Sequence, residues 1–172
     1  MGNLRYLRSD CPDSLSDEEV QWLRANNIVM IVDLRDETEY TRRACRLERE
    51  EGFVYHHLPV TGGGAVPASP EAVAEAYVRM LDGQMEKIVD TILRAETGVL
   101  FFCSAGKDRT GVVSAVLLKR LGFDDGEIIA DYMETKPNLM PFLLEYSKSH
   151  PEADLRIIIP SEDNIKAVLA LL

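Results

Sequence analysis

Three short apolar runs, separated by segments with helical character, constrain this chain more than any other feature of its sequence. Residues 28–32, 53–58 and 99–102 are rich in β-branched and aromatic side chains and are too short to be helices. Such runs are typical of strands buried on both faces of a parallel sheet. Residues 4–8 are expected to add a further short strand. The alternation predicts an α/β fold, with a central, mostly parallel sheet of about four or five strands flanked by helices on both faces.

Capping residues predict where the helices begin. Ser16 and Glu19 have capping-box spacing, so a helix is expected up to residues 26–27, with Val20, Leu23 and Trp22 facing the core. Ser69 followed by Pro70 is a typical helix start. The helical segments that we predict, the second of them interrupted near residues 82–83, are 37–51, 70–96, 110–121, 124–135, 137–149 and 161–172.

Length and charge limit the class of protein. The 172 residues are expected to form a single domain spanning 1–172. The formal net charge of −10 argues against binding nucleic acid, and any anionic substrate must be met by a local positive site. No run of about 18 apolar residues occurs and no secretory signal precedes the first strand, so integral membrane association is not expected. Three cysteines without framework or metal-ligand spacing predict a reducing, cytoplasmic location and no metal site.

The segment from residue 101 to residue 111 carries the chemistry. An apolar strand delivers Cys103 into a short loop, and Arg109 stands six residues later, where a helix begins. Such a loop can turn several backbone N–H groups toward one tetrahedral anion, and Gly106 would relieve crowding in the turn. The same positive field would stabilise a Cys103 thiolate. Arg109 can donate two parallel hydrogen bonds to a phosphate, and Thr110 could donate to the sulfur.

These residues define a candidate site for phosphate-ester hydrolysis. A few per cent of an ordinary thiol is already ionised at pH 7, so full ionisation of Cys103 would raise the concentration of the nucleophile only modestly. Most of the rate acceleration must therefore come from positioning and charge stabilisation. We therefore expect loss of Arg109 to be nearly as damaging as loss of Cys103. The candidate phosphate-binding residues are Ser104, Ala105, Gly106, Lys107, Asp108 and Arg109, and the candidate catalytic residues are Cys103, Asp108, Arg109 and Thr110.

The run CSAGKDRTG at residues 103–111 resembles the signature loop of protein-tyrosine phosphatases, and its GKDRTG core is most similar to that of bacterial tyrosine/lipid phosphatases and atypical dual-specificity enzymes. Three further segments, YLRSD, IVDLRDETEY and IADYMET, resemble the bacterial group more weakly. The resemblance implies a tyrosine-phosphatase-like fold and a two-step mechanism through a cysteinyl-phosphate, with no metal or organic cofactor. It implies a phosphorylated protein or a phosphoinositide as substrate and leaves the oligomeric state open.

Two departures from the family pattern concern catalysis. Phe102 stands where the family usually has a histidine, and the loop at residues 59–69 lacks the aspartate that many relatives use as general acid. Asp108 is the leading candidate to protonate the leaving group, although it could instead bond loop amides or pair with Lys107. Weaker candidates for the acid are Asp33, Asp36 and Glu37.

Several residues keep two interpretations. Lys107 could supply charge for a polyphosphorylated head group or could be a solvated surface lysine. Arg35 could fix the site or pair structurally with Asp33, and residues 62–64 could form a lid or a plain surface loop. Cys11 could serve as a redox partner for Cys103.

Two alternative functions remain. One is a phosphate-binding pseudophosphatase that docks phosphorylated partners without turnover. The other is a sulfur-transferase or arsenate-reducing enzyme, which would normally need a second placed cysteine.

Overall fold

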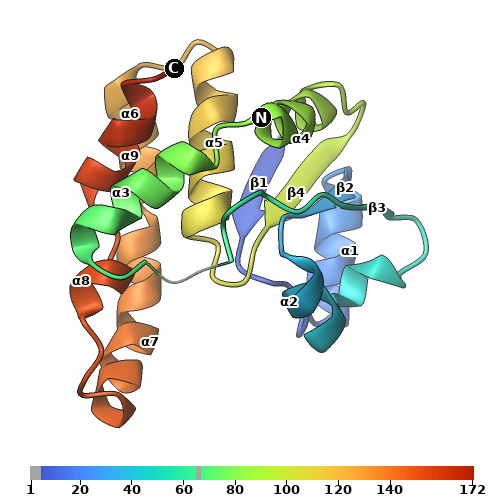
Figure 1. Cartoon of the computed structure of the whole chain (residues 1–172). Helices are drawn as coiled ribbons and strands as arrows, with labels where there is room; N and C mark the ends of the chain where they lie inside the picture. The colour runs from blue at the N-terminus through green and yellow to red at the C-terminus, as the bar shows by residue number, and fades with distance from the viewer. Residues whose placement is uncertain (1–4, 65–66) are drawn as a thin grey trace.

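The computed structural model of the chain describes residues 5–64 and 67–172. In these residues the strands form one sheet in the order β1 (Tyr6–Ser9), β4 (Gly98–Phe102), β2 (Ile28–Asp33), β3 (Val54–His57). Every neighbouring pair is parallel. The predicted α/β fold with a parallel sheet is thus confirmed, with four strands (Figure 1).

The central strand β4 is buried along its whole length. Because side chains alternate between the faces of a strand, Val99 and Phe101 point to one side of the sheet and Leu100 and Phe102 to the other. The first pair belongs to one hydrophobic cluster and the second pair to another. Both faces of the sheet are therefore covered, as a continuous apolar run predicts.

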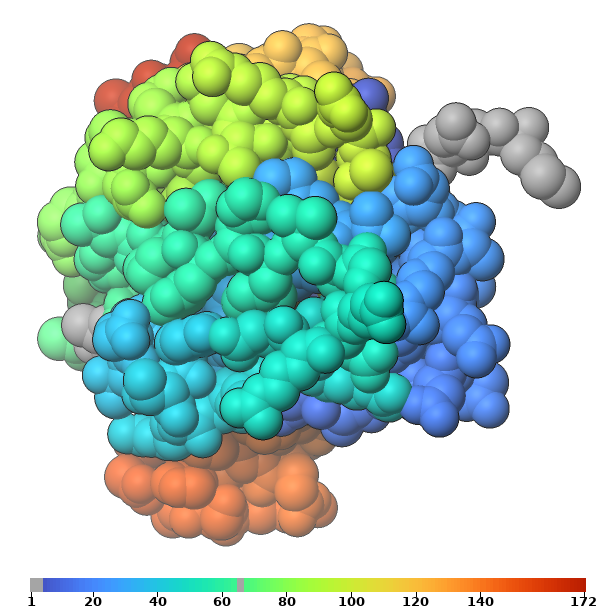
Figure 2. Space-filling view, turned by 90° about the vertical axis from the view of Figure 1, so that its right-hand side faces the viewer, coloured from blue at the N-terminus to red at the C-terminus, as the bar shows by residue number. Residues whose placement is uncertain are grey.

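Helices of unequal number cover the two faces (Figure 1). The cluster on one face includes buried side chains of helices α4 (Gly83–Leu93) and α5 (Asp108–Arg120). Helices α3 (Pro70–Arg79), α6 (Asp125–Met133) and α9 (Glu162–Leu169) pack against this layer. The cluster on the opposite face involves α1 and the short 3₁₀ helix η1. Helix α7 extends beyond the rest of the molecule, as Figure 2 shows from the side of β3. The bounds of the helices are α1 Asp17–Ala25, α2 Glu37–Arg42, η1 Arg46–Glu48, α3 Pro70–Arg79, α4 Gly83–Leu93, α5 Asp108–Arg120, α6 Asp125–Met133, α7 Thr135–Ser149, α8 Leu155–Ile158 and α9 Glu162–Leu169.

Several predicted boundaries are confirmed by caps. Ser16 caps α1 with the full capping box, and Ser69 caps α3 ahead of Pro70. Asp82 caps α4, so the predicted interruption near residues 82–83 separates two helices.

Three predictions about local structure are wrong, and one short helix was not predicted. The helix predicted over residues 37–51 stops at Arg42, because the chain becomes extended at Arg43 and turns inward to bury Cys45 and Leu47. Trp22 does not face the core and is 48% exposed. Strand β3 is an edge strand with Val54 exposed, and not a strand buried on both faces. The short helix α8, capped by Asp154, was not expected.

Candidate active site

The signature loop lies at the carboxyl end of β4, between the middle of the sheet and the first turn of α5. A pocket of about 340 Å³ opens there. In parallel α/β sheets this edge is where ligands bind. The loop residues that line the pocket are Cys103, Ser104, Ala105, Lys107, Asp108 and Arg109. A hollow of about 700 Å³ between α3 and α9 contains Glu71, Arg156 and Asp163 but no residue of this loop.

The backbone of the loop is held from behind by the segment after β1. Gly106 has a φ of +65°, and a Cβ there would lie 2.6 Å from the carbonyl carbon and oxygen of Ser9. The amide of Cys11 donates to the Ser104 carbonyl at 3.3 Å. Only glycine fits both the left-handed conformation and the close approach at Gly106. The expected role of Gly106 in the turn is thus confirmed.

The amides of this loop are available to a ligand. Within residues 5–64 and 67–172, no acceptor takes a hydrogen bond from the backbone N–H groups of residues 104–110. Unpaired amides at the start of a helix favour an anion, because their dipoles point the same way. The loop therefore has unpaired backbone donors, which a tetrahedral-anion site requires.

Cys103 lines the pocket and has 2% of its surface exposed. Beside it in sequence, Phe102 is fully buried on the opposite face of the sheet. The Thr110 hydroxyl is buried and has no hydrogen-bond partner among the described residues. A buried hydroxyl is costly to leave unpaired, and the donor of Thr110 is unused among the described residues.

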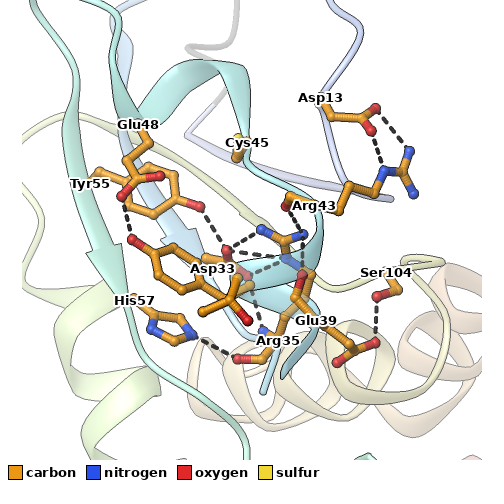
Figure 3. A network of polar contacts seen from close by, with 12 residues as sticks. Asp13, Asp33, Arg35, Glu39, Arg43, Cys45, Glu48, Tyr55, His57 and Ser104 are labelled. Carbon is orange, nitrogen blue, oxygen red and sulfur yellow. Dashed lines mark hydrogen bonds and ion pairs between the residues drawn. The ribbon is translucent and has the colours of Figure 1, made fainter. Parts of the chain in front are cut away.

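Arg109 is fixed by a residue that the sequence analysis did not single out. Both terminal nitrogens of Arg109 donate to the Glu39 carboxylate, one of them at 2.8 Å, and Ser104 Oγ donates to Glu39 Oε1 at 2.5 Å. Figure 3 shows Glu39 reaching Ser104 from α2. These hydrogen bonds, that from Arg109 first, lower the pKa of Glu39 to about 2. Burial alone would lower the pKa of Arg109, but Glu39 raises it above its ordinary value.

The signal for Glu39 was present in the sequence. Asp36 caps α2 with a capping box whose N3 residue is Glu39. A capping box explains a glutamate at this spacing without any function, so the pattern alone could not assign Glu39 to the site.

Asp108 begins α5 and has two partners on one oxygen. Tyr77 donates to Asp108 Oδ1 at 2.6 Å, and Lys107 Nζ lies 3.0 Å from the same atom. Pairing with Lys107, one of the interpretations given for Asp108, is therefore present. Tyr77 was not foreseen, because nothing in the local sequence of α3 distinguishes it from a core tyrosine.

Lys107 is neither solvated nor directed at open space. Its residue is 4% exposed, and Nζ donates to the carbonyl oxygens of Ile158 at 2.7 Å and Ile157 at 3.4 Å. The reading of Lys107 as a surface lysine is wrong. The ammonium group joins the signature loop to the end of α8.

Arg35 and the weaker acid candidates lie outside the pocket. Arg35 donates to both Asp33 oxygens, and Tyr55 donates to Asp33 Oδ2 (Figure 3). The Arg35 Cζ lies 5.3 Å from the Phe102 ring centroid. The pairing of Arg35 with Asp33 is therefore structural, which was one of its two interpretations. Among the described residues, neither Asp33 nor the candidates Asp36 and Glu37 line the pocket.

The other cysteines are buried, free thiols on the opposite face of the sheet from Cys103. Burial raises the pKa of Cys11 to about 12 and raises that of Cys45 as well. The structure therefore gives no support to Cys11 as a redox partner. The glycines at 62–64 line the pocket, whereas the loop residues 65–66 lie outside the described residues.

Neither a metal-binding cluster nor a membrane-spanning helix occurs in the described part of the chain. No group of three or more metal-ligating side chains is found among residues 5–64 and 67–172. None of the helices formed by these residues has the length and apolar character needed to cross a bilayer.

The family model and the known proteins that resemble this chain all represent phosphatases. A model of the tyrosine phosphatase family matches residues 3–169. A tyrosine-protein phosphatase of Nostoc commune is 30% identical over 137 residues, which cover 74% of this chain and 47% of that protein. A triple specificity protein phosphatase of Mycobacterium tuberculosis is 45% identical over 172 residues, covering 78% of this chain and 62% of that protein. The chain thus spans less than two thirds of the length of either relative.

Among solved structures, a kinase associated phosphatase with its catalytic-site cysteine replaced by serine is similar at a TM-score of 0.46 and 19% identity. The similarity covers 73% of this chain and 71% of that one.

Proposed function

Because the chain belongs to the tyrosine phosphatase family, we propose that it is a cysteine-dependent phosphomonoesterase that works through a cysteinyl-phosphate. One observation carries the proposal. Cys103, Arg109 and four further loop residues line one pocket, and the backbone N–H groups of residues 104–110 have no acceptor among the described residues. Donors fixed before the substrate arrives stabilise developing charge without reorganisation.

In the first step the Cys103 thiolate attacks phosphorus, the S–P bond forms and the bond from phosphorus to the ester oxygen breaks. The loop amides and the Arg109 edge not engaged by Glu39 bind the three non-bridging oxygens. Asp108 gives its proton to the departing oxygen, which leaves as an alcohol or phenol.

In the second step water attacks the phosphorus of the cysteinyl-phosphate and the S–P bond breaks. Asp108, now a carboxylate, accepts the proton from water, and orthophosphate forms. The sulfur leaves as a thiolate, to which the unpaired hydroxyl of Thr110 can donate. Both groups are then as they were before the first step.

The walls of the pocket favour phosphotyrosine as the substrate. Apart from Lys107 and Arg109, no lysine or arginine lines it in the described part of the chain, and each of these two has a carboxylate partner. A polyphosphorylated inositol would need more unpaired positive charge, whereas a phenyl ring needs apolar contact. The walls above the loop consist of Pro67, Ala76, Tyr77, Met80, Tyr146, Ile157 and Ile158.

Since all three cysteines are free, a reducing, cytoplasmic compartment is also proposed.

The test is hydrolysis of an aryl phosphate by the chain and by its Cys103→Ser variant. Turnover should be lost in the variant while vanadate still binds, and Cys45→Ala, which removes a buried thiol on the other face, should retain turnover. Initial rates on phosphotyrosine, phosphoserine and phosphoinositide substrates would then rank the substrate classes. Undiminished turnover by Cys103→Ser would refute the proposal.

A pseudophosphatase is the second candidate, motivated by Phe102 in place of the usual histidine. It predicts that the unmodified chain binds phosphopeptides and vanadate but hydrolyses no substrate in the same panel.

A further inference from the structure

The Asp108 carboxylate is held asymmetrically. Tyr77 and Lys107 both contact Oδ1, whereas Oδ2 has no hydrogen-bond partner among the residues that the structure describes. The Asp108 side chain is 39% exposed and lines the pocket. One oxygen is therefore fixed by the protein, and the other is available to a bound substrate.

Tyr77 reaches this carboxylate from the core. It belongs to α3, is 1% exposed, and its hydroxyl lies 2.8 Å from the hydroxyl of Tyr132 on α6. The two rings meet edge to face, with centroids 6.1 Å apart. Tyr132 packs closely on α5 because residue 111 is glycine, where a Cβ would come within 2.8 Å of the ring.

The directions of these hydrogen bonds follow from counting protons. Tyr77 has one hydroxyl proton and gives it to Asp108, so Tyr132 donates to the Tyr77 oxygen. Burial, followed by the Asp108 charge, raises the pKa of Tyr77 well above its ordinary value, and burial raises that of Tyr132 to about 12. Both hydroxyls therefore remain donors at any pH at which the protein would work.

We propose that Tyr77 is a positioning residue for Asp108, fixing Oδ1 so that Oδ2 is the oxygen that carries the proton to the leaving group. This inference rests on the proposed function, with Asp108 as the general acid. In the first step the O–H bond at Oδ2 breaks, the proton joins the leaving oxygen, and the new carboxylate charge is stabilised at Oδ1 by Tyr77 and Lys107. In the second step Oδ2 takes a proton from water.

The dependence of the rate on the leaving group tests the assignment. A general acid contributes about 10²–10⁴-fold, and it matters most when the departing oxygen is strongly basic. Tyr77→Phe should lower kcat/KM for phenyl phosphate about tenfold or more but that for 4-nitrophenyl phosphate less than about threefold. Tyr55→Phe is the matched control, because it removes a tyrosine-to-aspartate hydrogen bond of the same 2.6 Å length outside the pocket. It should leave the ratio of the two rates unchanged.

A double-mutant cycle separates positioning from packing. If Tyr77 acts through Asp108, then adding Tyr77→Phe to Asp108→Asn should lower phenyl phosphate hydrolysis by no more than about twofold further. If Tyr77→Phe leaves Tyr132 with an unpaired hydroxyl and folds poorly, the double variant Tyr77→Phe/Tyr132→Phe removes both hydroxyls and should have the same leaving-group signature.

If Cys103→Ser is inactive, two results would overturn the role of Tyr77. One is an equal loss of kcat/KM on phenyl phosphate and 4-nitrophenyl phosphate in Tyr77→Phe, and the other is that the effects of Tyr77→Phe and Asp108→Asn multiply. An inactive wild-type chain, or an active Cys103→Ser variant, would instead refute the proposed function and this inference with it.

Discussion

The Glu39 carboxylate accepts hydrogen bonds from both terminal nitrogens of Arg109, and so joins the helix that follows β2 to the loop that follows β4. A guanidinium has a second edge, formed by Nε and one terminal nitrogen, on which it can still bind an anion. Glu39 therefore fixes the orientation of Arg109 before any ligand arrives. The hydrogen bond from Ser104 fixes Glu39 in turn.

Replacing Glu39 with alanine should lower kcat/KM for an aryl phosphate by about ten- to a hundredfold, since a small misplacement of a phosphate-binding group is costly. Steady-state kinetics with 4-nitrophenyl phosphate, together with the inhibition constant of vanadate, would measure the effect. Glu18→Ala removes an exposed carboxylate on α1 and serves as the charge-matched control, with no expected change. Full activity of Glu39→Ala would mean that the loop alone orients Arg109.

The ion pair also makes a prediction about acid stability. The pKa of Glu39 is lowered in the folded protein to about 2 from an ordinary value of 4.5. A carboxylate with a lowered pKa stabilises the fold above its unfolded pKa and loses that contribution as pH falls toward the folded value. Urea unfolding should therefore show a constant advantage of the wild type over Glu39→Gln above about pH 5, and this advantage should shrink between pH 4.5 and 2. An advantage that is independent of pH across this window would contradict the assignment.

Gly106→Ala should damage both stability and activity. The left-handed conformation costs a non-glycine residue about 1–2 kcal/mol, and the new Cβ would also collide with the Ser9 backbone at 2.6 Å. Gly122, whose φ is +88° and where a Cβ would meet no atom within 4 Å, provides the control for the conformational cost alone. Each kcal/mol of lost stability lowers Tm by about 2–4 °C in a chain of this size. Gly122→Ala should lower Tm accordingly and leave kcat unchanged, whereas Gly106→Ala should lower both Tm and kcat. Equal effects of the two substitutions would show that contact with Ser9 is unimportant.

The sequence was sufficient to predict the sheet and the signature loop because both depend on local patterns. Val99 to Phe102 had to be a strand, and the residues after it had a spacing that suits one turn and a helix start. The early end of α2 could not be predicted in the same way, since it depends on the burial of Cys45 and Leu47 against the sheet. A charged segment gives no sign that two of its side chains will leave the helical pattern.

The partners of the loop were the part of the site that sequence reasoning missed. Glu39 and Tyr77 lie 70 and 31 residues from the loop residues that they bind. Each has an ordinary local explanation, as a capping residue in one case and a core residue in the other. Only the packing of α2 and α3 around the carboxyl end of β4 brings them to Arg109 and Asp108.

Lys107 provides the last prediction, because its contacts separate two accounts of substrate binding. The ammonium group is buried and bonded to the Ile158 carbonyl and to Asp108, so Lys107→Met would leave the part-buried Ile158 carbonyl without this donor and remove one of the two partners of Asp108 Oδ1. Such losses cost about 1–3 kcal/mol, so the urea midpoint of unfolding should fall in Lys107→Met. Lys87→Met, on the exposed side of α4, is the control and should leave the midpoint unchanged. If Lys107 is committed to these contacts, the variant should lose activity by a similar factor on phosphotyrosine and on a phosphoinositide. A loss confined to the phosphoinositide would instead mean that the ammonium group leaves α8 to bind a second phosphate of the head group.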